Sequence, residues 1–154
     1  MGYKIRNLLL TACCLFISVE SHAFNCSIAT TPVNFGVYDV FATLPLDSTG
    51  SITVSCNNPD KKPLPITVSI NQGNGGRFTP RQMLSSLGDR LNYYLYTNSS
   101  RTAIWGDSTG GSSVVTAIVS KDAVFNSLVY GRVPAGQNVS VGIYSDTLTA
   151  TVNW

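Results

Sequence analysis

The residues that most often perform chemistry in proteins are scarce in this sequence. Its 154 residues include one His, His22, and one Glu, Glu20, and both fall within the first 23 positions. The remaining chain therefore has no imidazole base and very few ligands for a metal ion. Charged residues make up 12% of the sequence, and the net charge is +2. Such scattered, nearly balanced charge excludes the basic footprint of a nucleic-acid-binding or membrane-surface protein.

The start of the chain has the organisation of a secretory signal. Lys4 and Arg6 give a positive first region, residues 8–19 form an almost uncharged apolar run, and residues 21–23 supply small residues for a signal peptidase. We therefore expect a signal peptide at residues 1–23 with cleavage before Phe24. The apolar run is too short for a comfortable membrane span.

Two alternatives apply to the same segment. Residues 10–13 resemble a lipoprotein cleavage box, which would place a lipid on Cys13, but the apolar run before it would then have only the five residues 8–12. A retained N-terminal anchor helix is the other alternative. With cleavage before Phe24, the mature chain of residues 24–154 has 131 residues, with eight Lys and Arg against seven Asp. That length suits one domain with its own core.

Two cysteines, Cys26 and Cys56, remain after residue 23. In an exported protein an even pair most simply forms one disulfide. Closing a loop of about 30 residues would stabilise the fold by roughly 3–4 kcal/mol in the chain-entropy model. A metal site is the alternative, but the mature chain lacks His, a C-x-x-C pair and a close Asp cluster. We expect no cofactor.

The last eight residues show the most regular pattern in the chain. Leu148, Ala150, Val152 and Trp154 alternate with Thr and Asn residues. Strict alternation is typical of a strand with one face in a core and one in water. We expect a strand over residues 148–154, and a long edge with an apolar face needs protection.

The rest of the mature chain reads as short strands separated by turn residues. Gly, Ser, Thr, Asn and β-branched residues dominate, as in all-β proteins. We predict about eight strands, and hence a single all-β antiparallel sandwich. The turns are expected at residues 47–50, 57–63, 72–76 and 134–137, and the strand candidates are residues 26–38, 51–56, 66–70, 91–97, 114–119, 125–133, 139–144 and 148–154, with residues 81–84 as a short strand or helical turn.

One stretch matches a catalytic pattern. Residues 106–110 fit G-x-S-x-G, in which Ser108 would be the nucleophile. That motif needs a strand leading into a helix and a base to accept the serine proton. The mature chain has no His, its lysines lie in polar loop-like settings, and no helix is evident after Gly110. We interpret the stretch as a hairpin loop and argue against an enzyme.

Several stretches together resemble the spore coat protein U domain family, which includes the subunits of archaic chaperone–usher (Csu-type) pili. The resemblance spans the mature chain in order. It is carried by Cys26 and by residues 33–39 (VNFGVYD), 50–56 (GSITVSC), 81–83 (RQM), 91–96 (LNYYLY), 105–107 (WGD), 130–137 (YGRVPAGQ) and 142–152 (GIYSDTLTATV).

The resemblance implies an incomplete immunoglobulin-like sandwich that lacks its last strand and exposes an apolar groove. A periplasmic chaperone would fill the groove first, and a strand from another pilus subunit would replace it at an outer-membrane usher. The interface with the chaperone or donor strand would include Leu148, Ala150, Val152 and Trp154. The protein would pass through the periplasm to the cell surface and serve adhesion and biofilm formation.

One departure from the family pattern matters. Polymerising subunits carry an alternating apolar extension before the first Cys, whereas cleavage before Phe24 leaves only Phe24 and Asn25 ahead of Cys26. Such a chain could accept a strand without supplying one, which suits a terminal pilus subunit. Earlier cleavage would free the alternating Leu15, Ile17 and Val19. The second hypothesis is a self-complete secreted coat or surface-binding protein outside any pilus.

Overall fold

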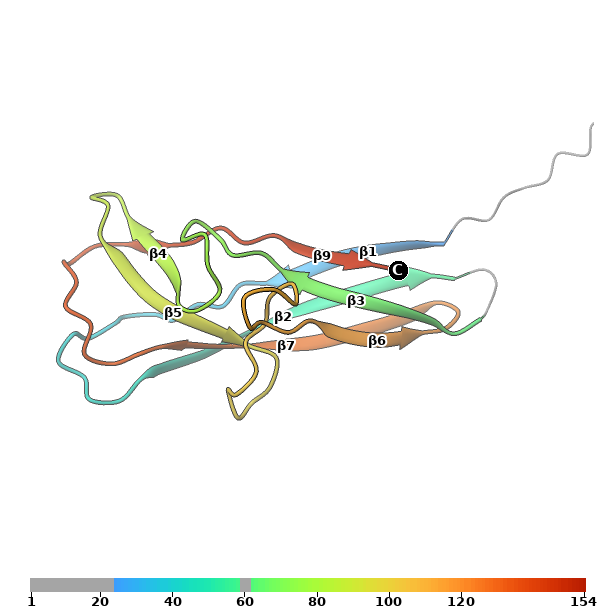
Figure 1. Ribbon diagram of the computed structural model, residues 1–154, viewed down its shortest axis with the longest axis horizontal. Helices are drawn as coiled ribbons and strands as arrows, with labels where there is room; N and C mark the ends of the chain where they lie inside the picture. The colour runs from blue at the N-terminus through green and yellow to red at the C-terminus, as the bar shows by residue number, and fades with distance from the viewer. Residues whose placement is uncertain (1–23, 59–61) are drawn as a thin grey trace, which may run out of the picture.

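A computed structural model describes residues 24–58 and 62–154 of the protein (Figure 1). The predicted signal peptide and its alternatives lie outside these residues. The nine elements in the described residues are all strands: β1 (Asn25–Thr31), β2 (Leu46–Asn57), β3 (Leu64–Ile70), β4 (Arg81–Ser85), β5 (Arg90–Tyr96), β6 (Val115–Val119), β7 (Ala123–Val133), β8 (Tyr144–Ser145) and β9 (Ala150–Asn153).

The strands form two antiparallel sheets. The larger sheet has the order β1-β2-β7-β5-β4-β8, and the smaller has the order β6-β3-β9. The longest pairing joins β2 to β7, from Leu46 opposite Val133 to Cys56 opposite Ala123. The smaller sheet lies over one end of the larger one, as Figure 1 shows. This confirms the predicted all-β, sandwich-like fold.

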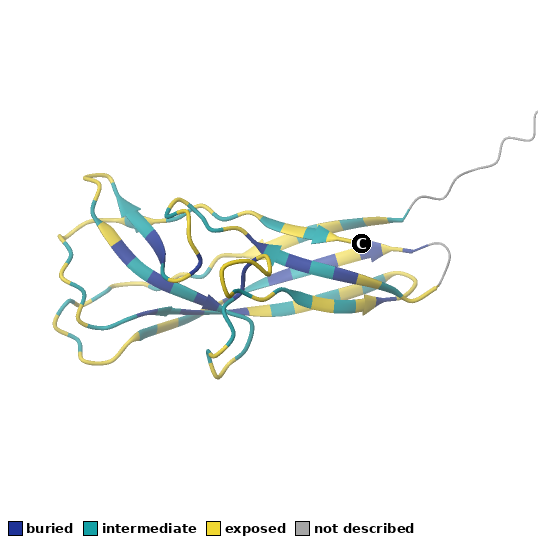
Figure 2. Ribbon diagram, in the orientation of Figure 1, coloured by how far each residue is buried: buried dark blue, intermediate teal, exposed yellow. Residues whose placement is uncertain are grey.

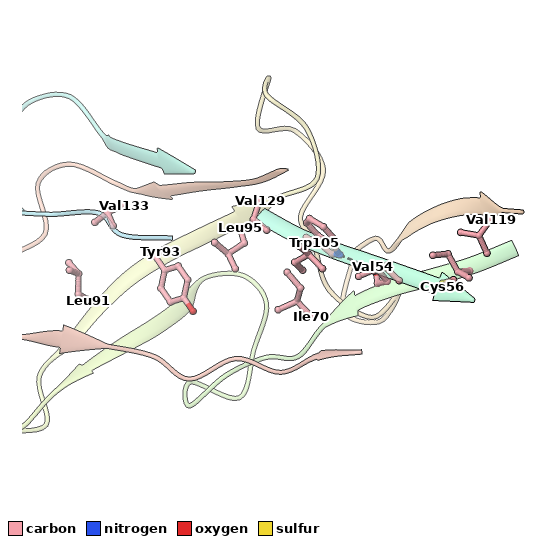
Figure 3. Packing of buried hydrophobic residues seen from close by; sticks show 13 residues of the cluster. Val54, Cys56, Ile70, Leu91, Tyr93, Leu95, Trp105, Val119, Val129 and Val133 are labelled. Atoms are coloured by element: carbon pink, nitrogen blue, oxygen red, sulfur yellow. Dashed lines mark hydrogen bonds between the residues drawn. The ribbon is translucent and has the colours of Figure 1, made fainter. Parts of the chain in front are cut away.

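The core lies between the sheets and follows the predicted alternation (Figures 2 and 3). Trp105 is fully buried, and its indole N–H donates to the Val68 carbonyl at 3.0 Å. The Cys26–Cys56 disulfide is present and ties β1 to β2, with Cys56 buried. The other members of the cluster are Ile52, Val54, Ile66, Val68, Ile70, Leu91, Tyr93, Leu95, Val119, Val129 and Val133.

The predicted turn at residues 47–50 is wrong, because this segment belongs to β2. Asp47 pairs with Arg132 and Gly50 with Val129 of β7. A Cβ on Gly50 would lie 2.5 Å from the Thr31 carbonyl oxygen, so the glycine permits close packing of β1 against β2. Long-range pairing overrides the local turn preference of these residues.

The two predicted strands nearest the C-terminus are shorter than expected. Residues 139–143 form no strand, and only Tyr144 and Ser145 pair, with β4. The final strand covers Ala150–Asn153 rather than residues 148–154. Alternation alone does not make a strand where no neighbouring backbone is available for pairing.

Candidate functional site

The first and last strands of the domain, β1 and β9, each pair along one edge only. β1 pairs with β2, and β9 pairs with β3, in the described part of the chain. The two strands lie near each other and run in opposite directions (Figure 1). Each therefore presents a row of free backbone N–H and C=O groups along its other edge.

Hydrogen-bond geometry identifies the free groups on β9. The Asn71 N–H donates to the Thr149 carbonyl at 3.0 Å, and the Thr149 N–H donates to Asn71 Oδ1 at 3.0 Å. The backbone N–H and C=O groups of Thr149 therefore point toward β3. Since backbone direction alternates along a strand, Leu148, Ala150 and Val152 direct their N–H and C=O groups to the open edge.

The free groups on β1 follow from its pairing with β2. Cys26 lies opposite Cys56 with a Cα–Cα distance of 4.1 Å. This short spacing is typical of a pair whose backbone groups point away from each other. Cys26 and, by alternation, Ile28 and Thr30 therefore direct their N–H and C=O groups away from β2, to the open edge.

An apolar groove of about 1060 Å³ continues from these edges. One rim is formed by residues 30–40, the end of β1 and the segment after it, and the other by residues 139–150, which reach the first residue of β9. The floor comes from inward-facing side chains of β2, β3, β5 and β7, several of which Figure 3 labels. These floor residues are Ile52, Ile70, Leu91, Tyr93, Leu95, Val129 and Val133.

Large apolar side chains on both rims face water. The exposed fractions are 91% for Val37, 102% for Val141 and 89% for Ile143. All three residues also line the groove. Exposed apolar rims around a groove are typical of a surface that binds another molecule.

The Pro134–Gln137 turn fixes both rims to the floor strand β5. The Tyr38 hydroxyl donates to the Pro134 carbonyl at 2.9 Å and accepts from the Gln137 N–H at 2.8 Å. The Gln137 side chain accepts from the Asn92 N–H and donates to the Asn92 carbonyl, at 2.8 and 2.9 Å. Gln137 thus takes the place of a strand partner for Asn92.

Asp146 provides the second attachment of the C-terminal rim. It accepts hydrogen bonds from the Tyr93 hydroxyl and from the Asn74 N–H, at 2.5 and 2.8 Å. Burial, and then the bond to Asp146, raise the pKa of Tyr93 far above its ordinary value. The fully buried Arg81 donates to the carbonyls of Asn71 and Trp105 beside this pair.

The four residues predicted at the interface occupy different places. Leu148 and Ala150 line the groove. Val152 is half-buried and packs against the core. Trp154 is 56% exposed, and its ring meets that of Phe24 edge to face at 5.4 Å.

The sequence interpretation did not find the polar residues that hold the rims. Tyr38, Gln137 and Asp146 lie within the stretches that carried the family resemblance, but no periodicity marks them. The hydrogen bonds that join them to Asn92, to Tyr93 and to one another span 45 to 99 residues, so only the fold brings them together. The alternation of Val33 and Phe35 was the available signal for the N-terminal rim.

The G-x-S-x-G stretch forms a self-contained loop. Asp107 accepts from the N–H and hydroxyl of Thr109, and Ser112 Oγ donates to the Thr109 carbonyl. Ser108 is exposed with a φ of 72°. Within residues 24–58 and 62–154, no group of His, Cys, Asp and Glu is arranged to hold a metal ion. A helix long and apolar enough to cross a membrane is likewise absent from those residues.

Comparisons with known proteins agree with this architecture. Residues 13–151 match the Spore Coat Protein U domain. Protein U of Myxococcus xanthus is 33% identical over 136 residues, which cover 79% of this chain and 71% of that protein. A solved structure of the CsuC-CsuE chaperone-tip adhesion subunit pre-assembly complex, from the archaic chaperone-usher Csu pili of Acinetobacter baumannii, matches with a TM-score of 0.60 and 25% identity. That match covers 86% of this chain and 40% of the other.

Proposed function

The chain belongs to the spore coat protein U domain family, and we propose that it is a structural subunit of a chaperone–usher type pilus, completed by a strand from another polypeptide. The observation that carries the proposal is the apolar groove between residues 30–40 and 139–150, which continues from the unpaired edges of β1 and β9. Likeness to a chaperone-bound pilus tip subunit supports the same function. On this proposal the protein is not an enzyme.

The groove suits an extended segment with alternating apolar residues. Its backbone would pair with the open groups of Leu148 and Ala150 on one side and with those of Thr30 and the residues after it on the other, since β1 and β9 approach each other directly at the end where Phe24 meets Trp154. Every second side chain would enter the groove, and the segment would cover the exposed rims. Because β1 and β9 run in opposite directions, the added strand is parallel to one and antiparallel to the other.

We propose that a periplasmic chaperone supplies the first strand and that another subunit replaces it at an outer-membrane usher. The protein would then be exported, pass through the periplasm and function at the cell surface in adhesion and biofilm formation. Cleavage before Phe24 would make it a terminal subunit that accepts a strand without supplying one. The family match begins at residue 13, ahead of that position, so the mature N-terminus decides this point.

A self-complete secreted coat or surface-binding protein is the second candidate. The 33% identity to Protein U is the observation that favours it. The exposed apolar rims weigh against it, because a finished domain would cover them.

Native mass spectrometry of protein recovered from the periplasm, with and without a co-expressed chaperone, tests the proposal. We expect a one-to-one complex and little free monomer. Ala150→Arg places a charge in the groove and should abolish the complex, whereas Thr151→Arg, on the outer face of the same strand, should not. A stable, oxidised free monomer of the wild type would support the self-complete alternative. The same spectra report the mature N-terminus.

A further inference from the structure

A band of tyrosine and arginine side chains crosses the outer face of the larger sheet. Tyr94 and Tyr96 of β5 lie opposite Arg132 and Tyr130 of β7, and Arg132 lies opposite Asp47 of β2. Directly opposed residues share a face, and the next residues along, Leu95 and Val133, face the core. We call Asp47, Tyr94, Tyr96, Arg101, Tyr130 and Arg132 the tyrosine–arginine band. It lies on the reverse side of the strands that form the groove floor.

Hydrogen bonds within the loop after β5 hold Arg101 beside the other residues of the tyrosine–arginine band. Asn98 Oδ1 accepts from the N–H groups of Thr102 and Ala103, and the Arg101 N–H donates to the Asn98 carbonyl. Arg101 has a φ of 54°, a left-handed conformation that non-glycine residues rarely adopt. Backbone strain of this kind persists where the surrounding structure fixes it, often for function.

The contacts of Arg101 within the subunit do not use all the hydrogen-bond donors of its guanidinium. Its guanidinium lies 5.9 Å from the centre of the Tyr130 ring, and Nη1 is 3.3 Å from Asp47 Oδ2. Asp47 is already held by Arg132, at 2.7 and 2.8 Å to its two oxygens. Arg101 Nε is buried without a hydrogen-bond partner among the described residues. Because Nε is buried, it cannot reach a ligand, and a bound carboxylate would instead meet the outer N–H groups of the Arg101 guanidinium.

The side chains of the tyrosine–arginine band indicate which class of ligand it would bind. Arg101 and Arg132 share the single carboxylate of Asp47, and Arg90 follows on the same face of β5, where its Nη1 donates to Gln82 Oε1 at 2.7 Å. Arginine binds carboxylates with two parallel hydrogen bonds. The rings of Tyr94 and Tyr96 lie 6.0 Å apart with an interplanar angle of 23°, and tyrosine offers an apolar ring and a hydroxyl to a ligand. An acidic polysaccharide carries complementary groups, because its sugar units present apolar ring faces, hydroxyls and carboxylates.

We propose that the tyrosine–arginine band binds an acidic polysaccharide, with the arginines receiving its carboxylates and the tyrosines its sugar rings. The net charge of the band and Arg90 is too small for the footprint of a nucleic-acid-binding protein. The inference does not depend on the groove being filled, because the two sites lie on opposite faces of the sheet. One subunit can use both.

Binding of polygalacturonate to the mature chain, purified from the periplasm, tests the inference by biolayer interferometry. We expect binding that weakens with salt, because exposed charges are screened, and none to the fully methyl-esterified polymer. Arg101→Gln should weaken binding about tenfold, the effect of losing one hydrogen bond between charged groups. Arg101→Lys should recover part of it. Arg77→Gln, which removes an exposed cation outside the band, should leave it unchanged.

Unchanged near-ultraviolet circular dichroism and denaturation midpoints separate loss of binding from loss of fold. Absence of polygalacturonate binding by the folded wild type would overturn the inference. Equal losses in Arg101→Gln and Arg77→Gln would also overturn it, as would equal binding of the esterified polymer. Self-association in sedimentation experiments that Arg101→Gln abolishes would assign the band to a protein contact instead.

Discussion

The Tyr93 hydroxyl donates a 2.5 Å hydrogen bond to the Asp146 carboxylate. Tyr93 belongs to the floor of the groove, and Asp146 belongs to its C-terminal rim. This contact therefore holds the rim in place while the edge of β9 is still unpaired. The groove has its shape before any strand enters it.

Asp146→Ala should destabilise the subunit by about 2–4 kcal/mol. The substitution leaves the Tyr93 hydroxyl and the Asn74 N–H without partners, and each unpaired group costs about 1–3 kcal/mol. Urea denaturation measures the change. Lys121→Ala, which removes the charge of a side chain that is 56% exposed, should change stability by less than about 0.5 kcal/mol. Equal effects of the two substitutions would show that Asp146 does not hold the rim.

Gly73→Ala should displace Asp146 from the same contact. A Cβ on Gly73 would lie 2.2 Å from Asp146 Oδ2, and the residue has a φ of 68°. Gly88→Ala is the matched control, because Gly88 also has a positive φ but has nothing within 4 Å of the added carbon. We expect the control to lose about 1 kcal/mol from backbone strain alone, and Gly73→Ala to lose clearly more by urea denaturation. Similar losses would contradict the steric interpretation.

Hydrogen exchange should distinguish alternate amides along the C-terminal segment. The amide of Thr149 is bonded to Asn71, and that of Thr151 faces β3 by alternation. Both should be protected relative to Leu148, Ala150 and Val152, whose amides face the open edge. Adding a chaperone or a synthetic donor strand should slow exchange at Leu148 and Ala150, which line the groove. Unchanged exchange there in a confirmed complex would show that the added chain does not pair with β9.

The pKa of Asp47 should be low and should depend on Arg132. Its hydrogen bonds with Arg132 lower the pKa from 3.8, and the charge of Arg101 adds to the effect. Because the folded pKa is lowered, the ion pairs stabilise the fold above pH 4, and this contribution is lost as the pH falls through the folded value. NMR titration should show the pKa of Asp47 rising toward 3.8 in Arg132→Gln. An unchanged pKa would assign the shift to another cause.

Local alternation identified the core strands, but not the groove. Ile52, Val54 and Cys56 face the core as predicted, because a half-buried strand requires this pattern. The same alternation failed at residues 139–143, where no strand lies alongside. The bonds of Tyr38, Gln137 and Asp146 join segments distant in sequence, so neither spacing nor composition marks them. The groove is likewise formed by segments distant in sequence, and no local pattern marks it.

The position of the disulfide determines how the domain would carry mechanical load. Cys26 lies near the start of β1, and Cys56 lies near the end of β2, which pairs with β1 on one side and with β7 on the other. A pull on the chain ahead of Cys26 passes through the covalent bond into an inner strand of the larger sheet. The ladder between β1 and β2 therefore cannot be unzipped from that end.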